Sequence, residues 1–392
     1  VSIVFVSGLN KEEKIHKEIK EKIKNKPNEK VKVLIQLKDE KVKNDLETDL
    51  INKKSKITTT FDKKLIASEI EASKLAEINL ENIEKIWPDR EIKSVLDYST
   101  NQINAPFLWN LGLSGKNVKV AVLDTGISDH EMLQNIVADK DFTGSNNPND
   151  NNGHGTHVAG ICCGKSDKYS GVAPEVLIYN GKVLNDNGQG YLSWLINGID
   201  WALDHNQDGN EDDKVYVISL SLGATYDNVE EQLNSPEVLK VKEAISKGVI
   251  VVIASGNCGS GCGGFKSVTT PGITKEAITV GALDDFNNWA SFSSGDSILD
   301  YIKPDVVAPG VNICSSYLNN NYMCLSGTSM STPHVTGAVA LLLENDSSLS
   351  PYQIKEILEK SSLDLGVNGN DIKYGSGLLD LSKVLDVGSI GE

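Results

Sequence analysis

The segment NVKVAVLD (residues 117–124) is an apolar run rich in β-branched residues, and it predicts a buried strand that ends in an aspartate. Similar runs follow at VYVISLSLG (215–223), GVIVVIASGN (248–257) and AITVGAL (277–283). Helical patterns lie among them at HVAGICC (157–163), YLSWLINGIDWALDH (191–205), EVLKVKEAISKG (237–248) and SMSTPHVTGAVALLLEND (329–346). Strands that alternate with helices predict an α/β fold, with a mostly parallel sheet covered by helices on both faces. Such sheets place their functional sites at the carboxyl ends of the strands.

Residues 11–93 have a different character and predict a separate, small α+β domain. The expected elements are a lysine-rich amphipathic helix at 11–26, a polar helical stretch to about residue 60, a second helix at 68–78, and strands at 31–37 and 82–88. A charged, proline-containing segment follows and is typical of a domain boundary. We therefore expect the larger domain to span residues 94–392.

The first ten residues, VSIVFVSGLN, are apolar and rich in small residues near their end. Such a stretch is compatible with the remnant of a secretory signal peptide, with a short strand or with an expression artefact. The charged start that defines a signal peptide is not part of the sequence. Secretion is therefore an expectation that depends also on the domain organisation and on the cysteines.

The formal net charge of −16 is unevenly distributed, with +3 in residues 1–93 and −19 in the remainder. An acidic body excludes nucleic acid and anionic membranes as expected partners, because phosphate binding needs a basic surface. It suits divalent cations, and the lysine-rich small domain complements its charge. No apolar stretch approaches the roughly 20 residues that a membrane helix needs, so we expect a soluble protein.

The six cysteines are an even number, which is compatible with disulfides outside the cell. Cys314 and Cys324 flank the turn-like LNNN and are predicted to face each other across a hairpin. Cys258 and Cys262 flank a short Gly-Ser-Gly loop, and the pair 162–163 lies in an apolar helical run that favours buried free thiols. Zinc binding is the competing interpretation, but the sequence contains no CxxC pair.

Candidate catalytic side chains lie in three short segments. Asp124 ends a buried strand, where a carboxylate can orient an imidazole, although an aspartate that caps the next turn has the same context. His154, in NNGHGTHVAG, is flanked by glycines at a helix start, a context that structural and metal-binding histidines share. His157 is expected to face the core or the sheet.

The third segment, SGTSMSTPHV, places Ser329 in a turn of small residues before a long apolar helix. Free backbone N–H groups at the helix start would serve an oxyanion beside this serine. Thr328, Ser331 and Thr332 are rival hydroxyls, helix capping is the structural alternative, and Pro333 fits the first helical turn. A nucleophile, a base and an orienting acid together predict acyl transfer by serine, in one of the known chain orders.

The segments VAVLDTGI, NGHGTHVAG and GTSMSTPHVTGA resemble the three signature blocks of the subtilisin-like (subtilase) family of serine peptidases. KVLNDNGQG, SLSLG, VIASGN and TPG are similar too, and the resemblance covers roughly residues 94–385. It implies a subtilisin-like fold and a secreted, monomeric serine endopeptidase. The substrates would be proteins and peptides, hydrolysed through an acyl-enzyme intermediate.

The resemblance also implies roles for individual residues. Asp124 would orient His154, His154 would act as general base and then general acid, and Ser329 would be the nucleophile. Asn257 matches the family's side-chain oxyanion donor, expected as a buried amide beside the Ser329 N–H. Two edge segments would pair with the substrate backbone, Gly188, Gln189 and Gly190 on one side and Ser221, Leu222 and Gly223 on the other. The main side-chain pocket would be walled by Ala254, Ser255 and Gly256 together with the Thr269–Pro271 region.

Residues 11–93 resemble the family's inhibitory propeptide, because SEIEASKLAEI and NIEKIWPD precede a segment similar to a mature N-terminus. The resemblance implies a zymogen whose own propeptide assists folding and then blocks the site until cleavage. We expect self-cleavage between about residues 90 and 97, which leaves 94–392 as the catalytic domain.

The acidic segment DHNQDGNEDD (204–213) has the D-x-N-x-D-G spacing of a calcium-binding loop. Asp204, Asn206 and Asp208 offer oxygens at alternate positions. The loop lacks a glutamate at its twelfth position, so Asp212 or Asp213 would have to substitute. The sequence predicts structural Ca²⁺ here, against the alternative of a solvated acidic loop.

Two other functions compete with the peptidase. A subtilase-like fold without catalysis could act as a binding or scaffold protein. A serine esterase or acyl transferase could use the same three groups, but its G-x-S-x-G turn is absent and the serine lies in GTSMS instead.

Overall fold

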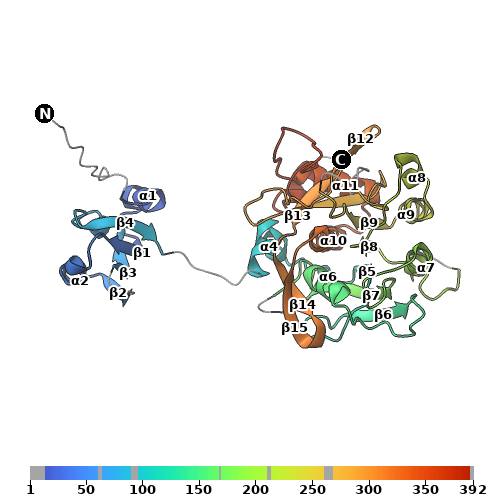
Figure 1. Cartoon of the computed structure of the whole chain (residues 1–392), viewed down its shortest axis with the longest axis horizontal. Coiled ribbons are helices and arrows are strands. Elements are labelled where there is room, and N and C mark those ends of the chain that lie inside the picture. The colour runs from blue at the N-terminus through green and yellow to red at the C-terminus, as the bar shows by residue number, and fades with distance from the viewer. Residues whose placement is uncertain are drawn as a thin grey trace. The chain divides into compact units, whose positions relative to one another are not determined.

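The computed structural model describes residues 14–60, 64–89, 96–166, 169–209, 213–259 and 268–388. The chain divides into two compact units, residues 1–93 and 94–392, and each is described by itself (Figure 1). The predicted signal-peptide remnant at 1–10 lies outside the described residues. Within the described ranges, no helix has the length and apolarity needed to cross a bilayer.

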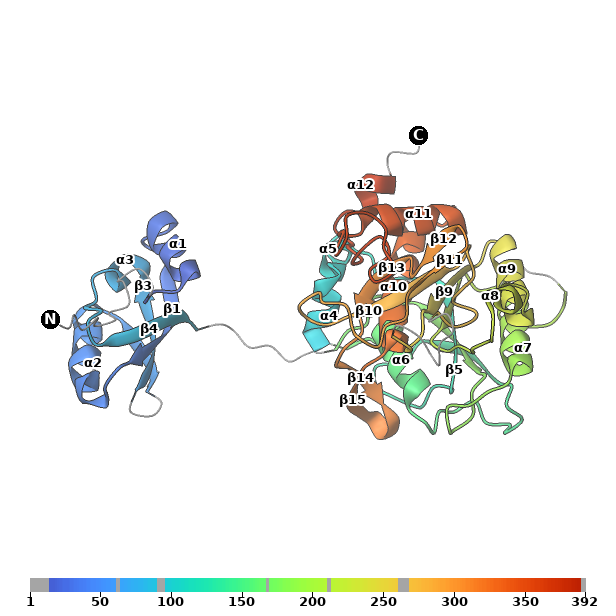
Figure 2. The ribbon, with the colours of Figure 1, turned by 45° about the horizontal axis from the view of Figure 1, so that its top comes forward.

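The smaller unit is an antiparallel sheet of four strands in the order β2-β3-β1-β4, accompanied by three α-helices among its described residues (Figure 2). Its elements are α1 (Lys17–Asn25), β1 (Lys30–Leu37), the 3₁₀ turn Glu40–Val42, α2 (Lys43–Asn52), β2 (Lys56–Thr60), β3 (Leu65–Glu71), α3 (Ala72–Leu75) and β4 (Ile83–Pro88). Alternate residues of β1 are buried, among them Val33 and Ile35, so one face of the sheet forms the core of this unit.

The predicted helix at 68–78 is confirmed only at Ala72–Leu75, and it is wrong at 68–71 because residues 65–71 form strand β3. Strand β3 pairs along its whole length with β1, which aligns Ile66 with Ile35 and Ile70 with Val31. The alternation of apolar residues in a short segment fits both periods, and the long-range pairing with β1 decides between them. For the same reason the helical stretch expected to reach residue 60 ends at Asn52 and gives way to β2.

The larger unit is built on a parallel sheet of seven strands in the order β13-β10-β9-β8-β5-β7-β6. The strands are β5 (Lys119–Asp124), β6 (Ile136–Asp141), β7 (Leu177–Lys182), β8 (Val217–Leu220), β9 (Ile250–Ala254), β10 (Ile278–Leu283) and β13 (Val306–Pro309). The predicted parallel α/β sheet is therefore confirmed. Strands β6, β7 and β13 were not among those expected from the sequence.

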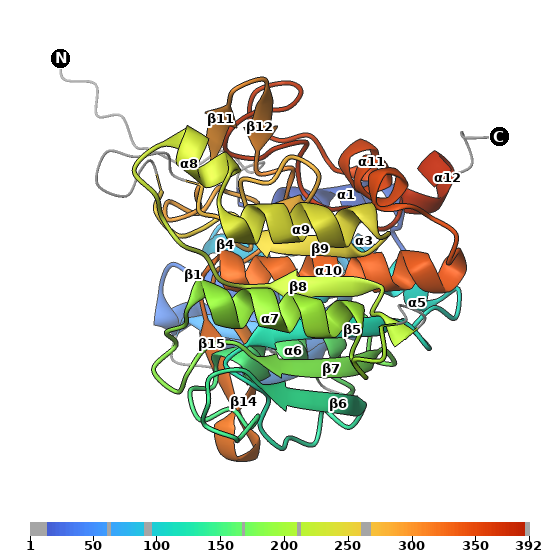
Figure 3. The same cartoon turned by 90° about the vertical axis from the view of Figure 1, so that its right-hand side faces the viewer.

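Helices cover both faces of this sheet, as Figure 3 shows. Val120 and Val122 of β5 pack into a core with α6 (His154–Cys163), α10 (Thr328–Asn345) and α11 (Pro351–Ser361). Ala121 and Leu123 point to the other face and pack with α7 (Leu192–Leu203) and α9 (Pro236–Ser246). The remaining helices of the unit are α4 (Leu96–Gln102), α5 (Ala105–Trp109), α8 (Val229–Leu233) and α12 (Val384–Gly388).

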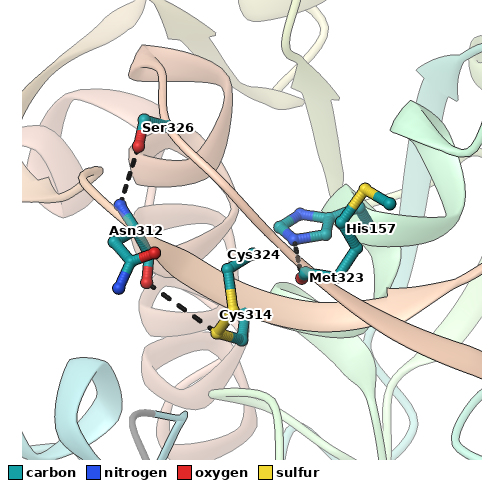
Figure 4. The surroundings of a disulfide bond; sticks show 6 residues. All are labelled: His157, Asn312, Cys314, Met323, Cys324 and Ser326. Atoms are coloured by element: carbon teal, nitrogen blue, oxygen red, sulfur yellow. Dashed lines mark hydrogen bonds between the residues drawn. A yellow bond between two sulfur atoms is a disulfide. The ribbon is translucent and has the colours of Figure 1, made fainter.

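A hairpin of β14 (Ile313–Tyr317) and β15 (Asn321–Leu325) precedes α10, and its turn contains the 3₁₀ residues Leu318–Asn320. Cys314 lies opposite Cys324 and forms a disulfide with it, as the spacing predicted (Figure 4). The buried His157 ring of α6 donates from Nε2 to the Met323 carbonyl at 2.9 Å, which ties the hairpin to that helix (Figure 4). A second, two-stranded ribbon consists of β11 (Asp296–Ile298) and β12 (Tyr301–Lys303).

The buried free thiols predicted for Cys162 and Cys163 are confirmed, whereas no pairing was predicted for Cys258. The pair 162–163 is buried in α6 as free thiols. Cys258 is disulfide-bonded, and Cys262 lies outside the described residues.

Candidate active site

The candidate site lies at the carboxyl ends of β5, β8 and β9, which are neighbours in the sheet. Asp124 is the last residue of β5, Ser221 directly follows β8, and Asn257 follows β9 by three residues. Because parallel strands end at the same edge, the fold brings together residues that are more than a hundred positions apart in sequence.

Asp124 and His154 form a short hydrogen bond, from the Nδ1 of the ring to Oδ1 of the carboxylate at 2.7 Å. Asp124 is 1 % exposed, and the same oxygen accepts the Thr125 N–H, which fixes the carboxylate. Because a carboxylate accepts, Nδ1 carries the proton and Nε2 of the neutral ring is left as an acceptor.

The glycines around His154 are required by close backbone approach. Gly153 precedes α6 with φ +99°, and a Cβ there would lie 2.2 Å from the Tyr317 ring. A Cβ on Gly155 would lie 2.2 Å from the Gly126 carbonyl oxygen. Glycine at 155 therefore lets the start of α6 lie against the loop after β5, and glycine at 153 leaves room for the Tyr317 ring.

The surroundings of His154 favour its protonated form. Burial lowers the pKa of this ring, but the charge and hydrogen bond of Asp124 and the charge of Asp150 outweigh that effect, so the pKa is raised. An imidazolium that formed at this position would thus be stabilised, as a general base requires.

Ser329 is the second residue of α10 and is half-buried. Its Oγ donates to the Ser221 carbonyl at 3.2 Å, and the Ser221 hydroxyl in turn donates to the Ser329 carbonyl at 2.9 Å. Among the hydrogen bonds of the described residues, none joins Ser329 to His154. Ser221 lines the same cleft as His154, so Ser329 is bonded to a residue of that cleft, although Ser329 itself is not among the residues that line it.

Pro333 lies in the second turn of α10, not in the first turn as predicted. Its missing N–H would otherwise have bonded to the Ser329 carbonyl, four residues earlier. The Ser221 hydroxyl supplies that hydrogen bond instead. The proline therefore leaves the Ser329 carbonyl available to anchor the helix start on the neighbouring strand end.

The rival hydroxyls of this segment are buried and have structural partners. Thr328 donates to Asn257 Oδ1 at 3.1 Å, Ser331 to the Ala308 carbonyl at 3.0 Å, and Thr332 to the Thr328 carbonyl at 2.9 Å. None of them caps the helix, because the N-cap is Gly327 and makes no side-chain cap hydrogen bond. The predicted capping role is thus wrong, and Ser329 alone of the four is partly exposed.

Asn257 is exposed, which corrects the expectation of a buried amide. Its Oδ1 accepts the Thr328 N–H at 2.9 Å, which orients the amide at the start of α10. With the oxygen anchored there, Nδ2 remains as a donor, and a Cβ on Gly327 would lie 3.3 Å from this Nδ2 and 3.7 Å from the Ser329 nitrogen. The Ser329 N–H has no acceptor within its own helix because it lies in the first turn.

Asp150 was not among the residues singled out from the sequence, yet it organises the loop before α6. It is 3 % exposed. Its Oδ1 accepts from Thr125 Oγ1 (2.9 Å), Asn152 N (2.8 Å) and Gly153 N (2.9 Å), and its Oδ2 accepts from Thr156 N (3.0 Å) and Oγ1 (2.7 Å). Three of these donors come from backbone amides on either side of His154, so the carboxylate fixes the loop that presents the ring. An aspartate among asparagines and glycines in NDNNG gives little signal of this role in the sequence.

A cleft of about 790 Å³ is lined by His154 and by both predicted edge segments. Gly188, Gln189 and Gly190 line one side, and Ser221, Leu222 and Gly223 line the other. Thr270 and Pro271 also line it, whereas Ala254, Ser255 and Gly256 do not. Ser255 is fully buried, and its carbonyl accepts the Thr269 N–H at 3.0 Å.

The predicted calcium loop is described except for residues 210–212, so the candidate ligand Asp212 lies outside the described residues. Asp204 accepts the N–H groups of Asp208 and Gly209, and Asp213 accepts the Asn206 N–H and contacts the His205 ring. Oδ1 of Asp213 is buried without a hydrogen-bond partner, a position that a cation would satisfy. The donor set of carboxylate and amide oxygens fits Ca²⁺. No cluster of three His, Cys, Asp or Glu side chains able to hold a metal occurs among the residues that the structure describes.

Comparisons with known proteins agree with this geometry. Residues 115–377 match the sequence model of the subtilase family of peptidases. The chain is 37 % identical over 361 residues to the serine protease AprX of Bacillus subtilis, an alignment that covers 84 % of this chain and 80 % of that protein. It is 41 % identical over 288 residues to subtilisin Savinase of Lederbergia lenta, covering 72 % of this chain and 96 % of that protein. Subtilisin E of Bacillus subtilis is 39 % identical over 297 residues, covering 74 % of this chain and 71 % of that protein.

Proposed function

The chain belongs to the subtilase family of serine proteases, and we propose that it is an endopeptidase precursor that uses Asp124, His154 and Ser329 as its catalytic triad. The observation that carries the proposal is the 2.7 Å bond between the buried Asp124 and His154, at a strand edge where Ser329 is anchored through Ser221. The three residue types have the roles that acyl transfer needs.

In the proposed mechanism Asp124 holds His154 in the tautomer with a free Nε2. Ser329 Oγ leaves the Ser221 carbonyl, turns toward Nε2 and attacks the peptide carbonyl while His154 takes its proton. Catalytic hydrogen bonds are often long or poorly aligned before substrate binds, and they tighten in the complex. His154 then returns the proton to the leaving amine, and a water molecule repeats the sequence to release the acyl group.

The negative oxygen of the tetrahedral intermediate would be stabilised by the Ser329 N–H and by Nδ2 of Asn257. The Thr328 N–H on Asn257 Oδ1 supports this role, because it fixes the amide before the charge develops. The two edge segments of the cleft would hold the substrate as an added strand, through its backbone.

The proposal extends to the smaller unit, which would be an inhibitory propeptide removed by self-cleavage between about residues 90 and 97. Residues 90–95 lie outside the described residues. The division of the chain at residue 93 supports the proposal, since a cleavage there would separate two compact units.

We propose further that the loop 204–213 binds structural Ca²⁺ through oxygens of Asp204, Asn206, Asp208 and the aspartates 212 and 213. The ion would neutralise the repulsion among these carboxylates and stabilise the loop after α7. Isothermal titration of the metal-free protein should show one binding event that Asp208→Ala removes. An unchanged titration in the variant would show that the ion binds elsewhere.

Secretion is also part of the proposal, supported by the disulfide of the β14–β15 hairpin, since such bonds persist in oxidising compartments. The processed form should then accumulate outside the cells that make the protein. Recovery of the processed form only inside those cells would contradict it.

The deciding experiment compares the full chain with Ser329→Ala. The wild type should lose its first ninety-odd residues, degrade casein and react with a phosphonate probe, whereas the variant should stay intact and unlabelled. Ser331→Ala is the matched control, because it removes a neighbouring hydroxyl from the same helix and should remain active. A wild type that neither labels nor cleaves would favour the non-catalytic scaffold, and one that cleaves esters but no peptide would favour the esterase.

A further inference from the structure

One acidic side chain lies at the cleft without a role in the proposed chemistry. Glu237 lines the cleft and is 0 % exposed. It is the second residue of α9, and the Tyr226 hydroxyl donates to its Oε2 at 3.2 Å. Its other oxygen, Oε1, is buried with no hydrogen-bond partner. A buried carboxylate with an unpaired oxygen is costly in free energy unless a positive charge approaches it.

No positively charged side chain among the described residues pairs with Glu237. Glu237 takes part in none of the ion pairs among the described residues, whereas Glu243 on the same helix pairs with Lys240 and Lys247. The described residues that line the cleft include no lysine or arginine, and Glu237 is the one acidic residue in that set. As a carboxylate, Glu237 would give the cleft a negative charge that solvent screens poorly.

A purely structural interpretation explains only part of this arrangement. A negative charge in the first turn of α9 is favoured by the helix dipole. Yet no backbone N–H of α9 donates to the carboxylate among the described hydrogen bonds, and the hydroxyl of Tyr226 is neutral. The unsatisfied Oε1 is left for a group outside the chain.

The remaining walls suit the rest of a long cationic side chain. Leu192, Leu195 and Leu222 line the same cleft and would contact an aliphatic stem. Tyr191, 69 % exposed, packs edge-on against Trp194 with ring centroids 4.8 Å apart, and both aromatic residues line the cleft. Aromatic faces attract ammonium and guanidinium groups.

We propose that Glu237 makes this part of the cleft a subsite for a lysine or arginine side chain of the substrate. The inference rests on the proposed function, and it gives Glu237 a role in substrate specificity, not in catalysis. Ala254 to Gly256 do not line the cleft, whereas Thr270 and Pro271 do, so the subsite shares only that wall with the pocket predicted from the sequence. Because a substrate held as a strand turns alternate side chains to opposite faces, one position of the peptide should carry the preference.

The test uses quenched fluorescent peptides that differ at one position at a time, with lysine, arginine, norleucine or glutamine at that position. Processed wild-type enzyme should prefer lysine or arginine over norleucine by about tenfold or more in kcat/KM at one position, as expected for a desolvated charge pair. Glu237→Gln should reduce that ratio to within about threefold, while its kcat/KM for the norleucine peptide changes little. Glu230→Gln, an equal change of charge at an exposed residue of α8, should keep the wild-type preference.

Glu237→Leu is a second variant, which removes the buried charge and should reverse the preference toward norleucine. The wild-type series is informative even if neither variant folds. If the wild type cleaves the peptides but prefers lysine or arginine at no position, the subsite is overturned and the proposed function remains intact. A preference for lysine or arginine that survives in Glu237→Gln has the same consequence. Failure of the wild type to cleave any peptide would instead overturn the proposed function on which the subsite depends.

Discussion

Replacing Asp150 by asparagine should weaken the loop that presents His154. The carboxylate accepts five hydrogen bonds, three at Oδ1 and two at Oδ2. Asparagine would replace one of these oxygens by an NH₂ group, which would then face either three donors or two. In the orientation that opposes fewer donors, the NH₂ group replaces Oδ2 and faces the N–H and the hydroxyl of Thr156. The hydroxyl can turn and accept, but the buried N–H is left without a partner.

An orphaned buried N–H costs about 1–3 kcal/mol, and hydrogen bonds to a charged acceptor lose roughly 1 kcal/mol more when it becomes neutral. We therefore expect Asp150→Asn to lower the free energy of unfolding by about 3 kcal/mol, or roughly 6–10 °C in Tm. The measurement should use the Ser329→Ala background, in which self-digestion is prevented. Asp129→Asn, the same change at a nearby exposed residue, is the control.

The same substitution should move the acidic limb of the kcat/KM profile. Asp150 contributes a negative charge that raises the pKa of His154, so removing it lowers that pKa. Because His154 must be neutral to act as a base, activity should persist to lower pH while the maximum kcat falls by about tenfold or more through misplacement of the ring. An Asp150→Asn enzyme with unchanged Tm and an unchanged acidic limb would refute the role given to this carboxylate.

Three further outcomes follow from the same structure. Asn257→Ala should lower kcat by about 10²–10³-fold with little change in KM, the size known for such a donor in a subtilisin; a loss below threefold would remove Asn257 from the oxyanion site. Burial lowers the pKa of His157 and His334 to about 4, below the unfolded value of 6.5, so each contributes stability above pH 6.5 that is lost as pH falls toward 4. This stabilisation amounts to about 3 kcal/mol per histidine. Urea unfolding should therefore show a smaller change in the free energy of unfolding between pH 7 and pH 4.5 for His334→Gln than for the wild type. An equal change in both proteins would contradict this role of His334. Paired replacement of Cys314 and Cys324 by serine should cost about 2–3 kcal/mol for a loop of this length; an unchanged denaturation midpoint would show that the hairpin does not need the bond.

Much of the larger unit could be predicted from local pattern alone. The runs that became β5, β8, β9 and β10 are apolar on both faces because each is covered on both sides, and that produces a continuous signal. Strands β7 and β13 have apolar runs too short to predict a strand from the sequence. Strand β6 lies at an edge of the sheet and contains charges of alternating sign, so its hydrophobic pattern did not predict a strand either. In the small unit, segment 65–71 has a helical composition and became a strand because β1 supplies its partner.

The sequence by itself determined which residue types stand in which order: an aspartate at a strand end, a histidine between glycines and a serine before an apolar helix. These are local features, and they also fixed the parallel α/β architecture. Only the tertiary structure decided that Asp150 organises the histidine loop, that Ser221 anchors Ser329, that Asn257 is exposed and that Glu237 lies unpaired at the cleft. The bonds of Ser329 to Ser221 and of Thr328 to Asn257 join residues 108 and 71 positions apart, and they exist only once the sheet has aligned its carboxyl ends. The contacts of Asp150 and Glu237 are more local, but they depend on loop and helix conformations that residue order does not reveal.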